Sequence, residues 1–142
     1  MTVNSARLLS LATSIGLAAA CSDYPPSAST SNAQRGTWGS NQASLIVGDS
    51  SATLQILASG GCFGSYGEIS RPIPKGAFSL PGVYTQLIGA YPGKVQYAAQ
   101  FTGDAEDNRL SITVTVSAPP QSFGPFSLAY GVKNTWPACL YP

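Results

Sequence analysis

Three cysteines are the side chains whose positions imply the most definite chemistry in this sequence. Cys21 directly follows an apolar run that ends in Leu17-Ala18-Ala19-Ala20, and Cys62 and Cys139 are the other two. An odd number of thiols in an exported protein leaves one thiol without a disulfide partner. We therefore expect Cys21 to be consumed as an anchor, and Cys62 and Cys139 to form a disulfide. The alternative for the pair is two free thiols.

The first 20 residues have the parts of a secretory signal peptide. Arg7 supplies positive charge, an apolar run extends from Leu8 to about Leu17, and small residues precede Cys21. Residues 8–20 number 13, fewer than the roughly 20 that a membrane-spanning helix needs. The segment is therefore expected to be a signal peptide, residues 1–20, that is removed.

The run Ala18-Ala19-Ala20-Cys21 resembles the lipobox of bacterial lipoprotein precursors, although its leucine lies one place further back than in the preferred form. The resemblance implies that Cys21 becomes lipid-modified, and that Ser22 favours the outer membrane if the organism has one. Two or three acyl chains anchor a protein stably, whereas one chain binds reversibly. The alternative is an ordinary secreted protein that keeps Cys21 as a spare thiol.

The rest of the chain carries few charges. Only 9% of all residues are charged, against about 25% in ordinary domains. Nucleic acid binding requires a concentrated basic surface, and no run of either sign occurs here. We therefore expect no nucleic acid partner.

Composition also divides the chain into segments. Residues 22–35 contain Pro25-Pro26 and then small polar residues without apolar periodicity, a composition that cannot offset the entropy of ordering. The expected organisation is a signal peptide at 1–20, a lipidated disordered tether at 21–35 and one domain at 36–142.

Apolar and polar residues alternate with a period of two in the domain, which indicates β-strands. The clearest run is 110–117, followed by 52–56, 95–101 and 126–130, with less regular candidates at 37–47, 62–69, 77–80 and 83–88. Turn residues such as Pro81-Gly82 and 103–108 separate them. The sequence predicts an all-β, antiparallel meander of seven to eight strands closed into a small barrel, the alternative being a β-sandwich. In the clearest run, the inward-facing residues should be Leu110, Ile112, Val114 and Val116.

Gly36-Thr37-Trp38 resembles the G-x-W motif that opens lipocalin and related calycin barrels, in which the tryptophan plugs one end. An early G-x-W-G, a mid-chain cysteine and a cysteine just before the C-terminus also resemble a group of uncharacterised bacterial lipoproteins. The resemblance covers residues 36–140 and implies a barrel. Two positions depart from lipocalins: Gln34 replaces an apolar residue, and no late arginine is available to stack on Trp38.

Catalytic chemistry finds little support in the residue types. The chain has no histidine, which removes Ser-His-Asp and Cys-His catalysis and His-based zinc sites. No serine lies three residues before Lys75, Lys94 or Lys133. Glu68 is the one candidate for a catalytic carboxylate, and it is alone in its region. We expect no enzyme activity and no cofactor.

One cluster of acidic residues falls in an expected turn at residues 103–108. Asp104, Glu106 and Asp107 could bind calcium through oxygen ligands. A polar hairpin loop explains the same residues, because turns favour them. We expect no metal site, with these three residues as the calcium candidates.

Aromatic side chains could line a ligand cavity or fill the core, since small barrels are usually packed solid. Phe63, Tyr66 and Tyr91 lie beside Gly or Pro in apparent loops, and with Trp38 they are the candidate contacts for a ligand or partner.

The expected function is a non-catalytic, exported lipoprotein that acts as a structural or interaction module of the cell envelope, is held in the membrane by lipid on Cys21, and is monomeric. Its partner would be an envelope protein. The alternatives are a lipocalin-like carrier of a small apolar ligand, and a protease inhibitor that inserts its tether or the Pro72–Lys75 loop into an enzyme cleft.

Overall fold

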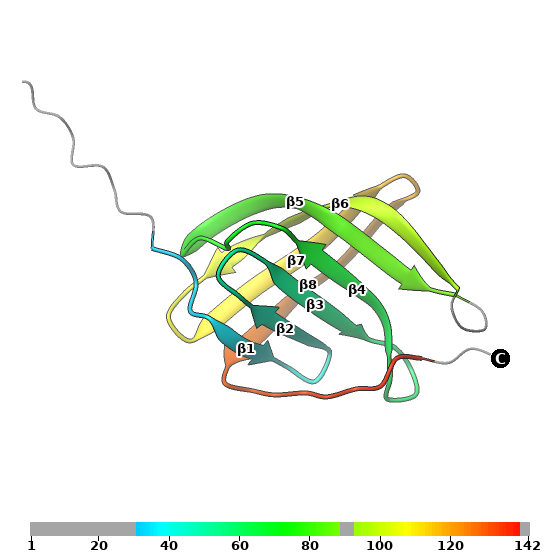
Figure 1. Ribbon diagram of the computed structural model, residues 1–142, viewed down its shortest axis with the longest axis horizontal. Coiled ribbons are helices and arrows are strands. Elements are labelled where there is room, and N and C mark those ends of the chain that lie inside the picture. Colours follow the sequence, from blue (N-terminus) through cyan, green and yellow to red (C-terminus); the bar gives the residue numbers. More distant parts are fainter. Residues whose placement is uncertain (1–30, 89–92, 140–142) are drawn as a thin grey trace, which may run out of the picture.

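The computed structural model describes residues 31–88 and 93–139 of the chain. These residues form eight strands: β1 (Gly36–Gly39), β2 (Ala43–Val47), β3 (Ala52–Leu57), β4 (Phe63–Ile69), β5 (Gly76–Leu87), β6 (Lys94–Ala105), β7 (Arg109–Ser117) and β8 (Pro120–Tyr130). Each strand pairs antiparallel with the next, and β8 returns to pair with β1 (Figure 1). The predicted all-β meander closed into a barrel is therefore confirmed. Within the described ranges, no helix has the length and apolar character needed to cross a membrane.

The strand that was clearest in the sequence is β7, and its predicted inner face is confirmed. Its four branched apolar residues are at most 2% exposed, whereas the hydroxyl residues between them reach the outer surface. Because successive side chains point to opposite faces of a strand, a strict alternation of types produces one dry and one wet face. The dry face of β7 consists of Leu110, Ile112, Val114 and Val116.

The middle of the barrel is filled by side chains. Phe101 is fully buried, and its ring lies where two glycines leave room for it. A Cβ atom on Gly67 would lie 2.5 Å from Phe101 Cε1, and one on Gly82 would lie 2.6 Å from Phe101 Cε2. Both glycines are therefore required by packing. The other large core residues with less than 2% exposure include Trp38, Leu45, Leu54, Ile69, Ile73, Leu110, Ile112 and Leu128.

The two ends of the barrel differ in how they are closed. We call the end that receives residues 31–35 the proximal end; it also holds the β2–β3, β4–β5 and β6–β7 connections. The distal end holds the β1–β2, β3–β4, β5–β6 and β7–β8 connections. The described chain starts at the proximal end and finishes at the distal end (Figure 1).

Trp38 closes the proximal end from the inside. Its ring meets that of Tyr130 edge-on, with centroids 5.1 Å apart, and its Nε1–H donates a hydrogen bond to the backbone oxygen of Gln34 at 3.0 Å. Tyr130 is therefore the aromatic neighbour of Trp38, and Gln34 contacts it through its backbone oxygen.

Residues 31–35, the last part of the expected tether, contact the barrel. Ala33 is only 5% exposed, its N–H donates to the backbone oxygen of Ile73 at 2.8 Å, and the N–H of Lys75 donates to the backbone oxygen of Ser31. Residues 31–35 therefore lie against the domain, because the β4–β5 connection offers them backbone partners. Residues 21–30 of the expected tether, and the whole expected signal peptide, lie outside the described residues.

Two of the expected strand assignments also differ from the structure. The expected strand 37–47 is a hairpin, β1 and β2, because the Ser40 hydroxyl accepts hydrogen bonds from the N–H groups of Gln42 and Ala43 and so forms a turn. Pro81-Gly82 lies inside β5 and is not a turn. β4 pairs with β5 only at Val83–Gln86, so Pro81 lies on a stretch with one strand neighbour, where a missing N–H is tolerated.

Residues 131–139, here called the strap, run from the end of β8 along β1 to the start of β4 (Figure 1). The N–H of Gly131 donates to the backbone oxygen of Thr37 at 2.8 Å, and the Asn134 side chain donates to the backbone oxygen of Ser40. Phe63 then exchanges two backbone hydrogen bonds with the strap, each 3.0 Å long, through Pro137 and Cys139. The strap therefore adds a short strand-like edge beside β4.

Candidate functional site

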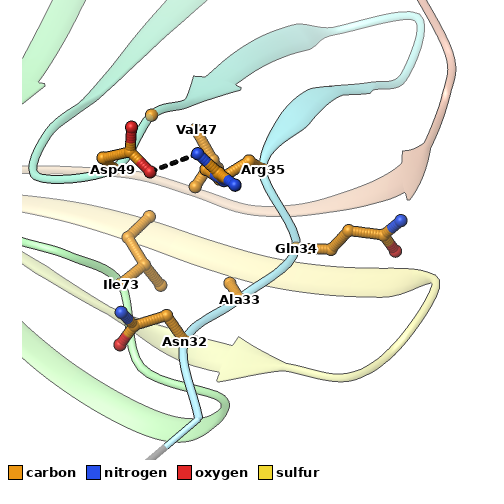
Figure 2. A pocket seen from close by; sticks show the side chains of 8 residues that line it. Asn32, Ala33, Gln34, Arg35, Val47, Asp49 and Ile73 are labelled. Atoms are coloured by element: carbon orange, nitrogen blue, oxygen red, sulfur yellow. Dashed lines mark hydrogen bonds and ion pairs between the residues drawn. The ribbon is translucent and has the colours of Figure 1, made fainter.

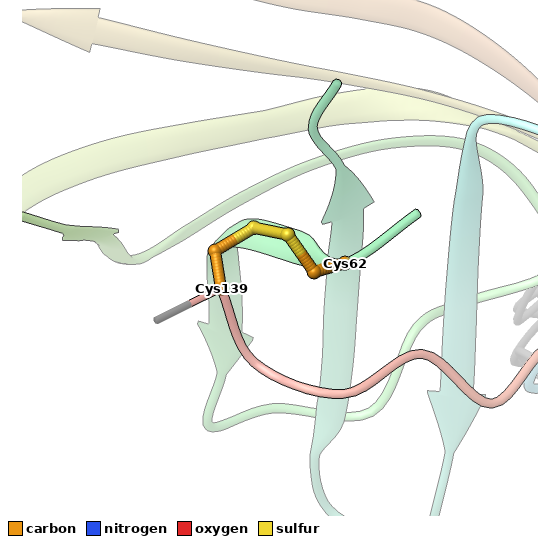
Figure 3. The surroundings of a disulfide bond; sticks show 2 residues. All are labelled: Cys62 and Cys139. Atoms are coloured by element: carbon orange, nitrogen blue, oxygen red, sulfur yellow. A yellow bond between two sulfur atoms is a disulfide. The ribbon is translucent and has the colours of Figure 1, made fainter. Parts of the chain in front are cut away.

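Cys62 and Cys139 form a disulfide, which confirms the predicted pair (Figure 3). Their Cα atoms are 5.0 Å apart, within the usual range for such bonds. Cys62 immediately precedes β4 and Cys139 lies at the end of the strap, so the bond fixes the strap to the distal end of the barrel. Cys21 lies outside the described residues.

The four aromatic residues expected to contact a partner do not gather in one place. Trp38 is fully buried, so it serves the core rather than a contact surface. Phe63 and Tyr66 are half-buried on β4 beside the disulfide, with ring centroids 6.4 Å apart in an edge-on arrangement. Tyr91 lies outside the described residues.

The acidic turn is shorter than expected because β6 continues to Ala105. Asp104 is therefore a strand residue, paired across the sheet with Ser111. Asp107 accepts a hydrogen bond from the Lys75 ammonium group. One of the three candidate calcium ligands is therefore already paired with a cation. In residues 31–88 and 93–139, no group of three or more His, Cys, Asp or Glu side chains is placed to hold a metal ion.

Glu68 lies in a surface groove where β4 and β5 separate. The groove has a volume of about 480 Å³, and its lining includes Ser51, Thr53 on β3, and Arg71. Glu68 is the one carboxylate in that lining, whereas glycoside hydrolysis needs a pair. The groove therefore offers no two-carboxylate chemistry.

A second hollow, of about 320 Å³, lies at the proximal end between residues 32–35 and the β2–β3 turn (Figure 2). Figure 2 shows the Arg35 side chain directed at Asp49, with which it forms an ion pair. Both side chains are largely exposed, so the pair contributes little stability. The apolar side of the hollow is formed by Ala33 and Ile73, which belong to the closure of this end.

An aromatic stack lies inside the distal part of the barrel and joins three strands. The ring of Tyr84 on β5 lies 4.7 Å from that of Phe123 on β8 at an angle of 20°, and 6.3 Å from that of Tyr97 on β6 at 30°. Tyr84 is 3% exposed, whereas Tyr97 and Phe123 are half-buried. The middle ring is thus fixed by its neighbours, and the outer two remain partly exposed in the distal half of the barrel.

The candidate contacts named from the sequence do not include the members of this stack, Tyr84, Tyr97 and Phe123. The segment Ser122-Phe123-Gly124-Pro125 lacks a strict alternation, and the β7–β8 register shifts between Ile112 and Val114. That irregularity turns Phe123 toward Tyr84.

Among the described titratable groups, Tyr84 is the one whose pKa clearly departs from its usual value. Burial raises the pKa of its phenol above the usual 10.0, a hydrogen bond with the Ser65 side chain lowers it in part, and the electrostatic interaction with Tyr97 raises it further. The net direction is upward. The folded barrel therefore favours a neutral Tyr84.

We expect Tyr84→Phe to make the barrel less sensitive to alkali. The pKa of Tyr84 is higher in the folded than in the unfolded chain. Below the unfolded-state pKa of about 10, both forms are neutral and the unfolding free energy is unaffected. Above about pH 10 the unfolded chain loses the proton first, so the unfolding free energy falls. Urea unfolding at neutral pH and at about pH 11 should show a smaller alkaline loss of unfolding free energy for Tyr84→Phe than for the unchanged protein. Equal losses would contradict the assignment, and Tyr66→Phe, on the outer face of β4, serves as the matched control.

Charged side chains are distributed unequally between the two ends. Among the described residues, the connections and strand ends of the distal end contain only Lys94, and Lys133 lies on the strap. The remaining charged residues lie in the proximal half: Arg35, Asp49, Glu68, Arg71, Lys75, Asp104, Glu106, Asp107 and Arg109. The distal end therefore presents uncharged groups almost exclusively.

A scan against protein-family models, a search of curated proteins and a search of solved structures each return no match to this chain.

Proposed function

We propose that the chain is an exported bacterial lipoprotein, anchored to the membrane through lipid on Cys21, with the outer membrane favoured by Ser22. Its barrel acts without catalysis, as a structural or interaction module of the cell envelope. The apolar run and small residues before Cys21 support the export and the anchor.

The observation that most favours an interaction module is the filled core. Phe101 and Trp38 are both fully buried and occupy the middle and the proximal end of the barrel. A carrier of a small apolar ligand needs an enclosed cavity of about 300 Å³ or more. The side chains that fill this barrel occupy the space in which a lipocalin-like ligand would lie, so the carrier alternative is disfavoured.

The inhibitor alternative has two possible inserting segments, and the contacts of one of them, the Pro72–Lys75 loop, disfavour it. Within the Pro72–Lys75 loop, Ile73 is 1% exposed and Lys75 pairs with Asp107. Backbone hydrogen bonds also join this loop to residues 31–33. A segment that enters a protease cleft must present its backbone and side chains, and this loop is instead held by the barrel.

Intact-mass analysis of the protein extracted from its native membrane tests the anchor. We expect a mature chain that begins at Cys21 and carries two or three acyl chains, since one chain binds a membrane only reversibly. Cys21→Ser should release the protein from the membrane fraction while Cys62→Ser, the matched control, leaves it there. A mature chain that starts elsewhere with a free Cys21 thiol would refute the proposal.

The absence of catalysis is tested by a broad hydrolase screen of the same preparation. We expect no turnover. Turnover that is abolished by Glu68→Gln or Lys75→Met would overturn the non-catalytic part of the proposal, because those residues carry the best-placed acidic and amine groups outside the core.

A further inference from the structure

We propose that the distal end of the barrel binds an uncharged carbohydrate, with the partly exposed rings of Tyr97 and Phe123 as the surface on which a sugar stacks. The inference rests on the proposed function and deepens it, since it names the chemical class of the partner that a tethered interaction module would hold.

Charge is the first argument. Of the described residues at the distal end, Lys94 is charged, and Lys133 on the neighbouring strap is the other charged residue nearby. A highly charged partner would find few complementary charges there, and the attraction that steers charged partners acts through such charges. A partner without net charge does not depend on electrostatic attraction, so the shortage of charges at this end does not weaken its binding.

The second argument is the partly exposed aromatic surface. Tyr97 and Phe123 are half-buried, and each already packs one face or edge against Tyr84, which fixes its orientation. Rings that are fixed before binding cost little entropy when a ligand orders on them. The electron-rich face of an aromatic ring attracts the slightly positive hydrogens of C–H groups, and a pyranose ring presents several such hydrogens on one side.

The third argument is the side chains that surround these rings. Gln86 is two residues from Tyr84 on the same face of β5, and Gln121 is two residues from Phe123 on β8. A side-chain amide both donates and accepts hydrogen bonds, as a sugar hydroxyl does. Uncharged amides beside apolar rings are therefore suited to a ligand with a C–H face and a hydroxyl rim.

The burial of the rings decides between a sugar and an apolar molecule. Tyr84 is 3% exposed and Phe101 is fully buried, so a ligand can contact only the partly exposed outer rings and keeps its other side in water. A fully apolar ligand would leave that side exposed, which removes much of the hydrophobic gain. A sugar ring places hydroxyls there without such a loss.

The test uses the full protein as the cell delivers it, held in a detergent without a sugar headgroup. Ligand-observed NMR and titration calorimetry are carried out with neutral probes, namely maltotetraose, a mannotetraose and the tetramer of N-acetylglucosamine. Oligogalacturonate and a glucosamine oligomer are the charged probes. We expect at least one neutral probe to bind, with a dissociation constant that changes by less than about twofold between about 0.05 and 0.5 M salt.

Variants locate the site. Tyr97→Leu and Phe123→Leu keep apolar volume but remove the ring, and each should weaken binding about tenfold or more. Tyr66→Leu removes a half-buried ring from the outer face of β4 and should leave the affinity unchanged. Gln121→Ala lies on the exposed end of the β7–β8 hairpin, so it should weaken binding without affecting folding even if a ring variant unfolds.

The proposal is overturned if no neutral probe binds at millimolar concentration, if a charged probe binds more tightly, or if binding falls steeply with salt. It is overturned equally if folded Tyr97→Leu, Phe123→Leu and Gln121→Ala all bind like the unchanged protein. Acylation of Cys21 is measured separately by mass, so loss of the sugar inference leaves the anchor proposal standing, and the reverse also holds.

Discussion

Val114→Asp should abolish folding, whereas Thr113→Asp, one residue away on the same strand, should be tolerated. Val114 is fully buried and pairs across the sheet with Phe101 and Phe123. A carboxylate at that position would be buried without a partner and costs several kcal/mol, a large part of the stability of a small domain. Thr113 points outward, opposite Thr102, so an aspartate carboxylate at this position would remain hydrated.

Circular dichroism and the yield of soluble, exported protein measure the difference. Val114→Ala, which creates a small cavity but buries no charge, serves as an intermediate and should fold with reduced stability. Similar stability for Val114→Asp and Thr113→Asp would mean that the inner and outer faces of β7 are assigned the wrong way round.

Cys139→Ser should lower the free energy of unfolding by about 2–4 kcal/mol, because the lost bond closes a long loop. The two cysteines are separated by 77 positions, so the reduced unfolded chain gains much freedom. Urea unfolding of the exported protein under non-reducing conditions measures the effect.

A set of related variants separates the covalent bond from its surroundings. Cys62→Ser and the double variant should lose the same free energy as Cys139→Ser, since all three break one bond. Ala138→Ser changes the same exposed part of the strap without touching a thiol and should change little. Losses that add in the double variant would show that the two sulfurs act separately.

The strands could be predicted because they depend on local alternation of apolar and polar residues, and the disulfide because it depends on the number of cysteines. The alternation in 110–117 identifies an inner face without knowledge of any partner strand. Cys62 and Cys139 are the two thiols that remain if Cys21 serves as the expected anchor, so the pair follows from counting.

The aromatic stack and the exact turns could not be predicted in the same way. Tyr84, Tyr97 and Phe123 come from three strands, and their meeting depends on the register of β5 with β6 and on the irregularity in β8. Pro81-Gly82 has the composition of a turn but lies in a strand, because Gly82 makes room for Phe101. Such cases are decided by tertiary contacts, which override local propensity.

The strap reinforces the short pairing between β8 and β1, where the barrel closes. Two residue pairs join these strands, Trp38 with Tyr130 and Gly39 with Ala129, the fewest of any neighbouring strands in the wall. The strap starts on one side of this joint, donates to Thr37 on the other, and is held at its far end by sulfur. The strap therefore holds β1 and β8 together from outside. A protease that cuts its exposed residues would remove this link and allow β1 and β8 to separate, while the disulfide itself stays intact.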